Sequence, residues 1–180
     1  MRAGKFVGLD VLSSKPRGTL GTGEFEWYTP AEWLDCAQGA GRFDLDPATS
    51  LVAQRTIKAK RFYTFDDDGL TEQWHGRVWM NPPYAQPAIG EFADKLVAEV
   101  EAEHVVEAIT LTHNYTDTRW FHLLDTADGL CFPEGRIRFI APDGSLASPT
   151  QGQALFYFGP AFEVFREVFA DAGHVLPVPR

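Results

Sequence analysis

The chain has 180 residues, of which 44% are hydrophobic and 13% aromatic, and this length and apolar content suit one globular domain with a single core. No apolar stretch reaches the roughly 18 residues of a membrane helix, and Met1 to Lys15 lacks the apolar centre of a secretion signal, so a cytoplasmic protein is expected. The net charge of -9 argues against non-specific coating of nucleic acid, which requires an excess of Lys and Arg.

The first 60 residues predict an arm, two helices and a short strand. Residues 1–24 contain chain breakers without periodicity, so we expect a flexible arm before a domain of residues 25–180. The run Thr29-Pro30-Ala31-Glu32 predicts a helix that extends to Gln38, with Thr29 as N-cap and Glu32 completing a capping box. A brief strand is predicted over 43–46 and a helix over 52–60.

The middle of the chain contains the clearest periodicity. Arg77 to Met80 predicts a strand that stops at two prolines. From Pro87 to Val100, apolar residues recur every three or four positions, which predicts a helix. Glu91 is placed to pair with Lys95 on its outer face.

The second half begins as further alternation and then changes character. A buried strand is predicted over 105–112 and a helix over 118–124, an alternation that is typical of a parallel sheet. Strands are predicted over 130–132, 137–140 and 154–158, with a turn at 141–144. This pattern favours an antiparallel edge of the sheet. A final helix over 160–173 has Gly173 as its stop. The fold class expected is an α/β sandwich with a mixed, mostly parallel sheet.

The run Asn81-Pro82-Pro83-Tyr84 lies between a strand and a helix, where open α/β sheets bind ligands. Two prolines remove backbone donors and fix φ, so the Asn81 side chain and the Pro82 carbonyl can act as rigid acceptors for a planar amine. Accepting two hydrogen bonds from that amine makes its nitrogen nucleophilic, and Tyr84 can stack on a base that is flipped out of a duplex. The alternative is that the prolines merely end a strand and Tyr84 packs on the surface.

Five blocks together resemble the phage-type DNA N-6-adenine-methyltransferase (Dam) family over residues 25–159. The blocks are Glu26-Trp27-Tyr28-Thr29-Pro30, Asp44-Leu45-Asp46-Pro47-Ala48, Asp68-Gly69-Leu70 before Trp74, Asn81-Pro82-Pro83-Tyr84, and Gly135-Arg136-Ile137 with Gly152-Gln153. The resemblance implies a Rossmann-like methyltransferase fold, S-adenosyl-L-methionine as methyl donor and DNA adenine as acceptor, with the host cytoplasm as the location for a phage-encoded enzyme.

The same resemblance implies a set of cofactor residues. Trp27, Tyr28, Thr29 and Pro30 would touch the methionine end, where a helix N-terminus offers N–H groups to a carboxylate. In the next block, Asp46-Pro47-Ala48 would bring a carboxylate to the methionine amine, whereas Asp44 either assists or caps a turn. Asp68 would accept from the adenine amine, although Asp-Gly is also a common turn dipeptide.

The sequence departs from the broader methyltransferase pattern beside the cofactor. No Gly-x-Gly follows Asp46-Pro47, and only about twenty residues separate it from Asp68, too few for the usual helix and strand passage. We therefore expect an abbreviated sheet. Because no long insertion could form a target-recognition domain, sequence readout is expected from loops, with 135–152 as the candidate.

Basic residues suggest two DNA contacts. Arg55, Lys58, Lys60 and Arg61 gather four of the sixteen basic residues into seven positions, either against phosphates or as a solvated helix face. Beside the candidate readout loop, Arg136 and Arg138 are candidates for contacts with base edges.

Other chemistries find little support. The histidines have no metal-ligand spacing, the two cysteines are predicted to be reduced core residues, and no nucleophile elbow is present, so neither a metal nor a covalent intermediate is expected. Two rivals stay open: an amino-methyltransferase acting on cytosine N4, RNA adenine or a protein glutamine, and a non-catalytic phage protein that grips DNA. The target sequence, its strandedness, the oligomeric state and the biological role are left open by the sequence.

Overall fold

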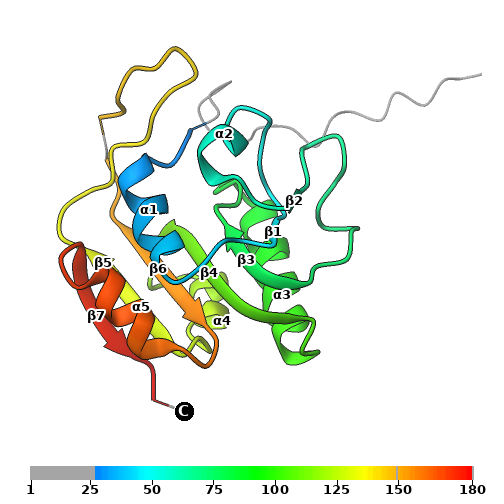
Figure 1. The fold of residues 1–180 in the computed structure, drawn as a ribbon, viewed down its shortest axis with the longest axis vertical. Coiled ribbons are helices and arrows are strands. Elements are labelled where there is room, and N and C mark those ends of the chain that lie inside the picture. The colour runs from blue at the N-terminus through cyan, green and yellow to red at the C-terminus, as the bar shows by residue number, and fades with distance from the viewer. Residues whose placement is uncertain (1–26, 149, 180) are drawn as a thin grey trace, which may run out of the picture.

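The computed structural model describes residues 27–148 and 150–179 (Figure 1). The predicted arm of residues 1–24 lies outside them. The strands in this part of the chain are β1 (Leu45–Asp46), β2 (Arg61–Phe62), β3 (Gly76–Met80), β4 (Val105–His113), β5 (Gly129–Pro133), β6 (Gln153–Phe158) and β7 (Gly173–Pro177). The helices are α1 (Ala31–Gly39), α2 (Gln54–Ile57), α3 (Ala88–Glu101), α4 (Arg119–Leu124) and α5 (Phe162–Phe169).

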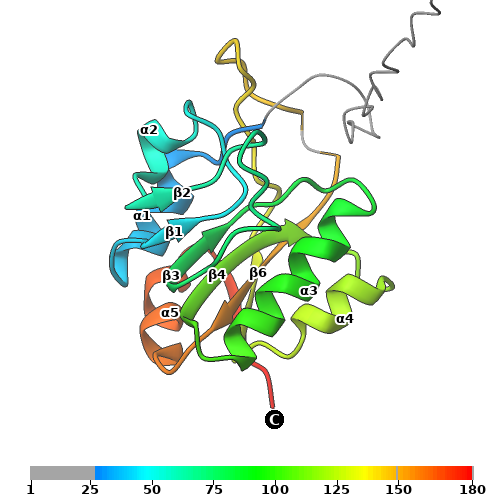
Figure 2. The same ribbon diagram turned by 90° about the vertical axis from the view of Figure 1, so that its right-hand side faces the viewer.

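All seven strands form one mixed sheet in the order β2-β1-β3-β4-β6-β5-β7. The first four strands of that order are parallel, and β6, β5 and β7 continue the sheet with antiparallel pairing. Helices α3 and α4 cover one face, while α1 and α5 cover the other (Figure 1, Figure 2). The expected mixed α/β class with an antiparallel edge is confirmed.

Burial on both faces explains why the central strands are continuous apolar runs. In β3, Val78 and Met80 pack into the core under α3 and α4, whereas Trp79 packs into the core under α1 and α5. Along β6, Leu155 and Tyr157 face the second core and their neighbours face the first. The sheet therefore separates two apolar layers.

Three predicted elements are wrong in extent or kind. The helix predicted over 52–60 is only the single turn α2, because Lys58 adopts φ 53 and ends it. Residues 137–140 do not form a strand; instead Ile140 makes isolated bridges to Tyr28 and Leu146. Gly173 is not the helix stop but the first residue of β7, which pairs with β5 and takes the sheet edge.

Two predicted side-chain contacts are also wrong. Thr29 does not cap α1, since Pro30 is the N-cap without a side-chain bond and the Thr29 hydroxyl instead accepts from Asn81 Nδ2. Lys95 pairs with Glu99 at 2.9 Å rather than with Glu91. Glu99 also binds His104 at 2.8 Å, so its carboxylate holds the end of α3 against the turn that follows.

The expected abbreviation lies between β2 and β3, where residues 63–75 contain neither helix nor strand. This loop is nevertheless packed: Trp74 is fully buried and donates through Nε1 to the Gly69 carbonyl at 2.8 Å. Gly69 in turn lies against the Pro47 carbonyl that follows β1. A loop thus occupies the place of the missing elements and is fixed to the end of the neighbouring strand.

The buried side chain of Arg77 joins neighbouring elements at the amino ends of the central strands. The Arg77 side chain pairs with Glu107 of β4 at 2.9 Å and donates to the carbonyls of Ala37 and Gly41 at the end of α1. Its guanidinium also lies 4.6 Å from the centre of the Phe43 ring. One side chain therefore fixes β3, β4 and the end of α1 to one another.

The contact between Gly69 and Pro47 generates a stability prediction. A Cβ at Gly69 would lie 2.0 Å from the Pro47 carbonyl oxygen, so Gly69→Ala should lower the free energy of unfolding by about 1 to 3 kcal/mol. Gly90→Ala is the matched control: Gly90 lies inside α3, where a Cβ would make only an ordinary contact, 3.7 Å from Gln86 Oε1, and a gain of up to about 1 kcal/mol is expected. Urea unfolding of both variants makes the comparison, and equal midpoints would contradict the proposed crowding.

Candidate active site

Asn81 is held by hydrogen bonds from two directions at the end of β3. Its Nδ2 donates to the Thr29 hydroxyl at 3.2 Å, and its Oδ1 accepts from the Tyr84 hydroxyl at 2.7 Å. Tyr84 also lies 3.4 Å from the Leu111 carbonyl of β4. Because the Thr29 oxygen and the Tyr84 proton face different atoms of the amide, the orientation of the Asn81 side chain is determined.

The loop retains acceptor capacity after these contacts. A carbonyl oxygen has two lone pairs, so Asn81 Oδ1 can accept a second hydrogen bond beside that of Tyr84. The carbonyl of Pro82 accepts from no residue of the described chain, although Pro82 itself is buried. Two acceptors one residue apart are thereby available to a donor such as an amine.

Tyr84 belongs to a line of rings that the sequence did not reveal. Its ring centre lies 4.2 Å from that of His113 and 6.5 Å from that of Phe139, and His113 stacks on Tyr115 at 5.0 Å. Burial raises the pKa of Tyr84, so its hydroxyl stays a donor, and burial lowers the pKa of His113, so its ring is neutral. The buried His113 Nδ1 has no partner among the described residues. His113 and Tyr115 end or follow a predicted strand, and that position was the available signal.

Asp46 ends β1 at the same edge of the sheet and is 1% exposed. Its carboxylate accepts from Gln54 Nε2 at 2.7 Å and from the Ala48 N–H at 3.3 Å. Burial raises the pKa of Asp46 to about 7, against hydrogen bonds from Thr49, Ala48 and Gln54 that lower it. Within the described ranges no cation forms an ion pair with it, so this buried carboxylate fits a cationic ligand.

The other expected cofactor residues lie in two places: Asp68 is near the end of β1, and residues 27–29 precede α1. Asp68 lies on the loop whose next residue, Gly69, contacts Pro47, so the segments around Asp46 and Asp68 are adjacent. Thr29 reaches Asn81, Tyr28 bridges to Ile140, and Trp27 is 45% exposed.

Asp44 lies elsewhere, at the amino end of β1. There it pairs with Lys60 at 2.6 Å and accepts from the Arg77 N–H at 2.9 Å. The hydrogen bond from Lys60 holds the pKa of Asp44 below its usual range. Asp44 is thus not brought together with Asp46.

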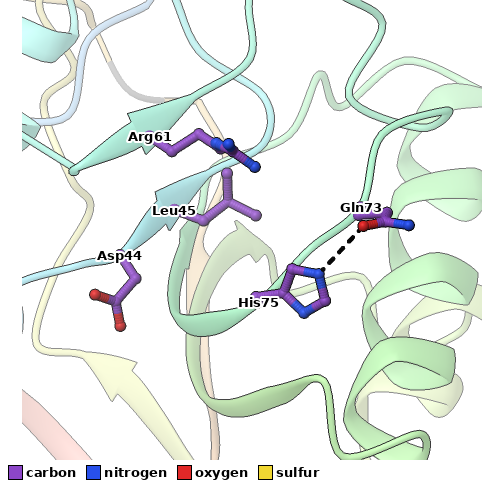
Figure 3. A pocket seen from close by; sticks show the side chains of 5 residues that line it. All are labelled: Asp44, Leu45, Arg61, Gln73 and His75. Atoms are coloured by element: carbon purple, nitrogen blue, oxygen red, sulfur yellow. Dashed lines mark hydrogen bonds between the residues drawn. The ribbon is translucent and has the colours of Figure 1, made fainter.

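The basic residues expected to contact DNA also fall in two places. Figure 3 shows Arg61 over Leu45 in a pocket of about 200 Å³ that Asp44, Gln73 and His75 complete. Asp44 and His75 precede β1 and β3, so this pocket lies at the amino ends of the strands, away from Asn81. Lys60 is bound to Asp44 there, while Arg55 and Lys58 are exposed on and just after α2.

Arg136 and Arg138 lie nearer to the Asn-Pro-Pro-Tyr loop. Both are exposed and alternate with buried Ile137 and Phe139, and Phe139 packs edge-on against the Tyr84 ring. The segment that carries them belongs to the long connection between β5 and β6, which projects beyond the sheet (Figure 1). These two arginines are therefore joined to the Asn-Pro-Pro-Tyr loop by a direct contact of their segment.

The described residues also bear on metal binding, membrane crossing and the state of the cysteines. Among the described residues no group of three or more His, Cys, Asp or Glu side chains is arranged to hold a metal ion. In the same part of the chain, no helix has the length and apolar character needed to cross a bilayer. Both cysteines are free thiols, with Cys131 buried and Cys36 half-buried.

Comparison with known proteins gives one family and two relatives for this chain. A model of the family described as DNA N-6-adenine-methyltransferase (Dam) matches residues 19–167. A DNA N-6-adenine-methyltransferase of Escherichia phage T1 is 31% identical over 98 residues, which cover 53% of this chain and 38% of the relative. A protein of the same description from Haemophilus phage HP1 (strain HP1c1) is 31% identical over 83 residues, covering 46% and 44%. The chain thus matches less than half the length of either relative. Since the family match covers most of this chain, the protein belongs to the DNA N-6-adenine-methyltransferase (Dam) family.

Proposed function

We propose that this protein transfers a methyl group from S-adenosyl-L-methionine to the N6 amine of a flipped-out adenine at specific sites in DNA. The observation that carries the proposal is the Asn81 amide, held by Thr29 and Tyr84 beside the Pro82 carbonyl, which accepts no hydrogen bond from the described residues. The two acceptors suit the two protons of an exocyclic amine. Family membership supports the same reaction class.

The proposed reaction is a direct displacement. The amine donates to Asn81 Oδ1 and to the Pro82 carbonyl, which withdraws its lone pair from the ring and directs it outward. When bound, S-adenosyl-L-methionine supplies a methyl group attached to a positively charged sulfur. The new C–N bond forms as the C–S bond breaks, and the nitrogen then releases one proton to solvent. No residue of the chain has to be alkylated, and no metal is required.

Tyr84 has two roles in this proposal. Its hydroxyl fixes the Asn81 oxygen at 2.7 Å, and its ring offers an aromatic face to the adenine. Pro83, which is exposed, stiffens the backbone between the two acceptors and Tyr84. The rings of His113 and Phe139 restrict how far the Tyr84 ring can turn.

Asp46 is the proposed contact for the methionine amine, because its buried carboxylate has no cation partner in the described chain. The segment from Trp27 to Pro30 would contribute at the methionine end, and Asp68, together with Pro47 and Ala48, would line the side toward the adenosine. This assignment places the cofactor between the ends of β1 and β3, which are neighbours in the sheet.

The experiment that tests the function is incubation with labelled S-adenosyl-L-methionine and DNA, followed by digestion to nucleosides. Label in N6-methyladenine is the expected result. Label in N4-methylcytosine, or label found only with an RNA substrate, would mean that the protein is an amino-methyltransferase with a different acceptor. Cofactor binding without turnover on any adenine-containing DNA would favour a non-catalytic DNA-binding protein and overturn the proposal.

A first prediction from the proposed function concerns binding of the cofactor. S-adenosyl-L-methionine at a hundredfold excess over its Kd should stabilise the folded protein by about 2 to 3 kcal/mol if it binds only that state. Asp46→Asn keeps the volume of the side chain but removes the charge, and it should lose most of this stabilisation. Thermal unfolding with and without cofactor measures both effects. A well-folded sample that shows no shift would count against the cofactor site.

A second prediction separates the roles of the catalytic loop. Asn81→Ala should reduce turnover by about a hundredfold or more, with cofactor affinity nearly unchanged. Tyr84→Phe removes the hydroxyl that donates to Asn81 and lies near the Leu111 carbonyl but keeps the ring, so it should reduce kcat, whereas Tyr84→Ala should in addition weaken acceptor binding through lost stacking. Single-turnover rates and cofactor calorimetry provide the comparison. Near-normal methylation by Asn81→Ala would mean that the catalytic loop lies elsewhere.

A third prediction concerns DNA. If Arg55, Lys58, Lys60 and Arg61 face phosphates, Lys58→Glu combined with Arg61→Glu should weaken binding equally for all sequences and flatten an already shallow salt dependence. Substituting Arg136 and Arg138 by Ala should instead change which site is methylated. DNA affinity against salt, scored together with site preference, tests both sets. Unchanged affinity in the first variant would identify that cluster as a solvated face.

A further inference from the structure

Gln54 is the side chain that binds the Asp46 carboxylate most closely. Its Nε2 donates to Asp46 Oδ2 at 2.7 Å and to the Thr49 hydroxyl at 3.2 Å. Its Oε1 accepts from the Ala59 N–H at 3.0 Å. One amide thus connects the end of β1, the loop that follows it and the chain that leads into β2.

The backbone after α2 determines which way this amide faces. Lys58 has a left-handed conformation with φ 53, which ends α2 and leaves the next N–H directed at Gln54. An N–H can donate only to the oxygen of the amide, so the NH₂ group must face Asp46. The turn at Lys58, which the sequence predicted to lie inside a longer helix, therefore aims one amide proton of Gln54 at Asp46 and the other at Thr49.

We infer that Gln54 is a positioning residue that keeps the Asp46 carboxylate ionised and in one orientation for the cationic amine of the methyl donor. This inference rests on the proposed cofactor site. Gln54 itself need not touch the cofactor, because its NH₂ group is already used by Asp46 and Thr49.

The hydrogen bond from Gln54 affects whether the Asp46 carboxyl group is ionised. A carboxylate 1% exposed is destabilised by burial, and the hydrogen bonds from Thr49, Ala48 and Gln54 oppose that effect, leaving the pKa of Asp46 at about 7. Removing the short bond from Gln54 tips the balance further toward the protonated form. A neutral carboxyl group would attract a cationic amine far less.

The other charged groups around Asp46 do not explain its behaviour. Asp44 and Lys60 pair with each other at the opposite end of β1, and Arg77 is bound to Glu107. The remaining charged or titratable groups on the adjoining helix, strand and loop are Arg55, Lys58, Arg61, Asp66, Asp67, Asp68, Glu72 and His75. None of these groups is a cause of the pKa shift of Asp46, whose causes are burial and hydrogen bonding.

Three variants test the inference. Gln54→Glu keeps the acceptor for Ala59 but replaces the donor to Asp46 with an oxygen, and Gln54→Leu removes both. The matched control is Gln38→Leu, because Gln38 Nε2 donates to the Ile57 carbonyl at 2.9 Å and so fixes α2 without contacting Asp46. A purely structural role for Gln54 predicts similar behaviour in all three.

The readout is the affinity for S-adenosylhomocysteine, which carries the same amine, measured by calorimetry from about pH 6 to about pH 9. In the unsubstituted protein affinity should fall as the pH drops through about 7. In the Gln54 variants this fall should begin about one pH unit higher, which gives roughly fivefold weaker binding near pH 7 and approaches roughly tenfold at lower pH. The ratio of the affinity of the unsubstituted protein to that of each Gln54 variant should approach one as the pH rises. Titration of the ligand amine itself is common to all proteins and cancels in this ratio.

A second readout does not involve the ligand. Carbon-13 NMR of the Asp46 carboxyl group in the free protein should show its titration moved to higher pH in Gln54→Glu and unmoved in Gln38→Leu. If the unsubstituted protein binds the ligand and the Gln54 variants show unchanged pH profiles and an unmoved carboxyl titration, the inference is overturned and the proposed function stands. If the unsubstituted protein binds no ligand, the proposed function fails first and the inference falls with it.

Discussion

The buried guanidinium of Arg77 is the interaction on which the arrangement of the strands depends. It binds Glu107 of β4 and two carbonyls at the end of α1, so the amino ends of the central strands and the helix that packs on them are fixed together. A buried charge is tolerated only when its donors are satisfied, and this one is partnered at Nε and both terminal nitrogens. With Asp44 and Lys60 paired beside it, the polar groups at this end of the sheet are used in folding.

The carboxyl ends of the same strands have the opposite character. Asp46 lacks a cation, the Pro82 carbonyl lacks a donor and His113 Nδ1 lacks a partner, all judged over the described residues. Parallel pairing of β1, β3 and β4 brings these ends to one edge of the sheet. Unsatisfied buried groups reduce stability, so their concentration at one edge is expected where a ligand supplies the missing partners. The physical difference between the two ends therefore supports the proposed site independently of any motif.

The sequence predicted the parts of this picture that local chemistry determines. The strand before Asn81, the loop that carries it and the abbreviated region before β3 follow from prolines, apolar runs and spacing. What failed depends on contacts between distant residues. Thr29 matched a helix cap, yet its hydroxyl accepts from Asn81, 52 positions away. Likewise, Gln54 lies within the helix predicted over 52–60, and only the turn at Lys58 and the approach of Asp46 bring its amide to the proposed cofactor site.

The net charge of -9 constrains how such a site could engage DNA. Several cations are already neutralised, since Lys60, Arg77, Lys95, Arg119 and Arg166 pair with carboxylates in the described chain. Few counterions would then be released on binding, and phosphate contacts alone would give little affinity. Under the proposed function, contacts with the unstacked base would supply more of the binding energy, and the neighbouring rings of Tyr84, His113 and Tyr115 offer aromatic surface for such contacts. An acidic methyltransferase of this kind would discriminate against DNA that offers no extruded base, because little other binding energy is available to hold it.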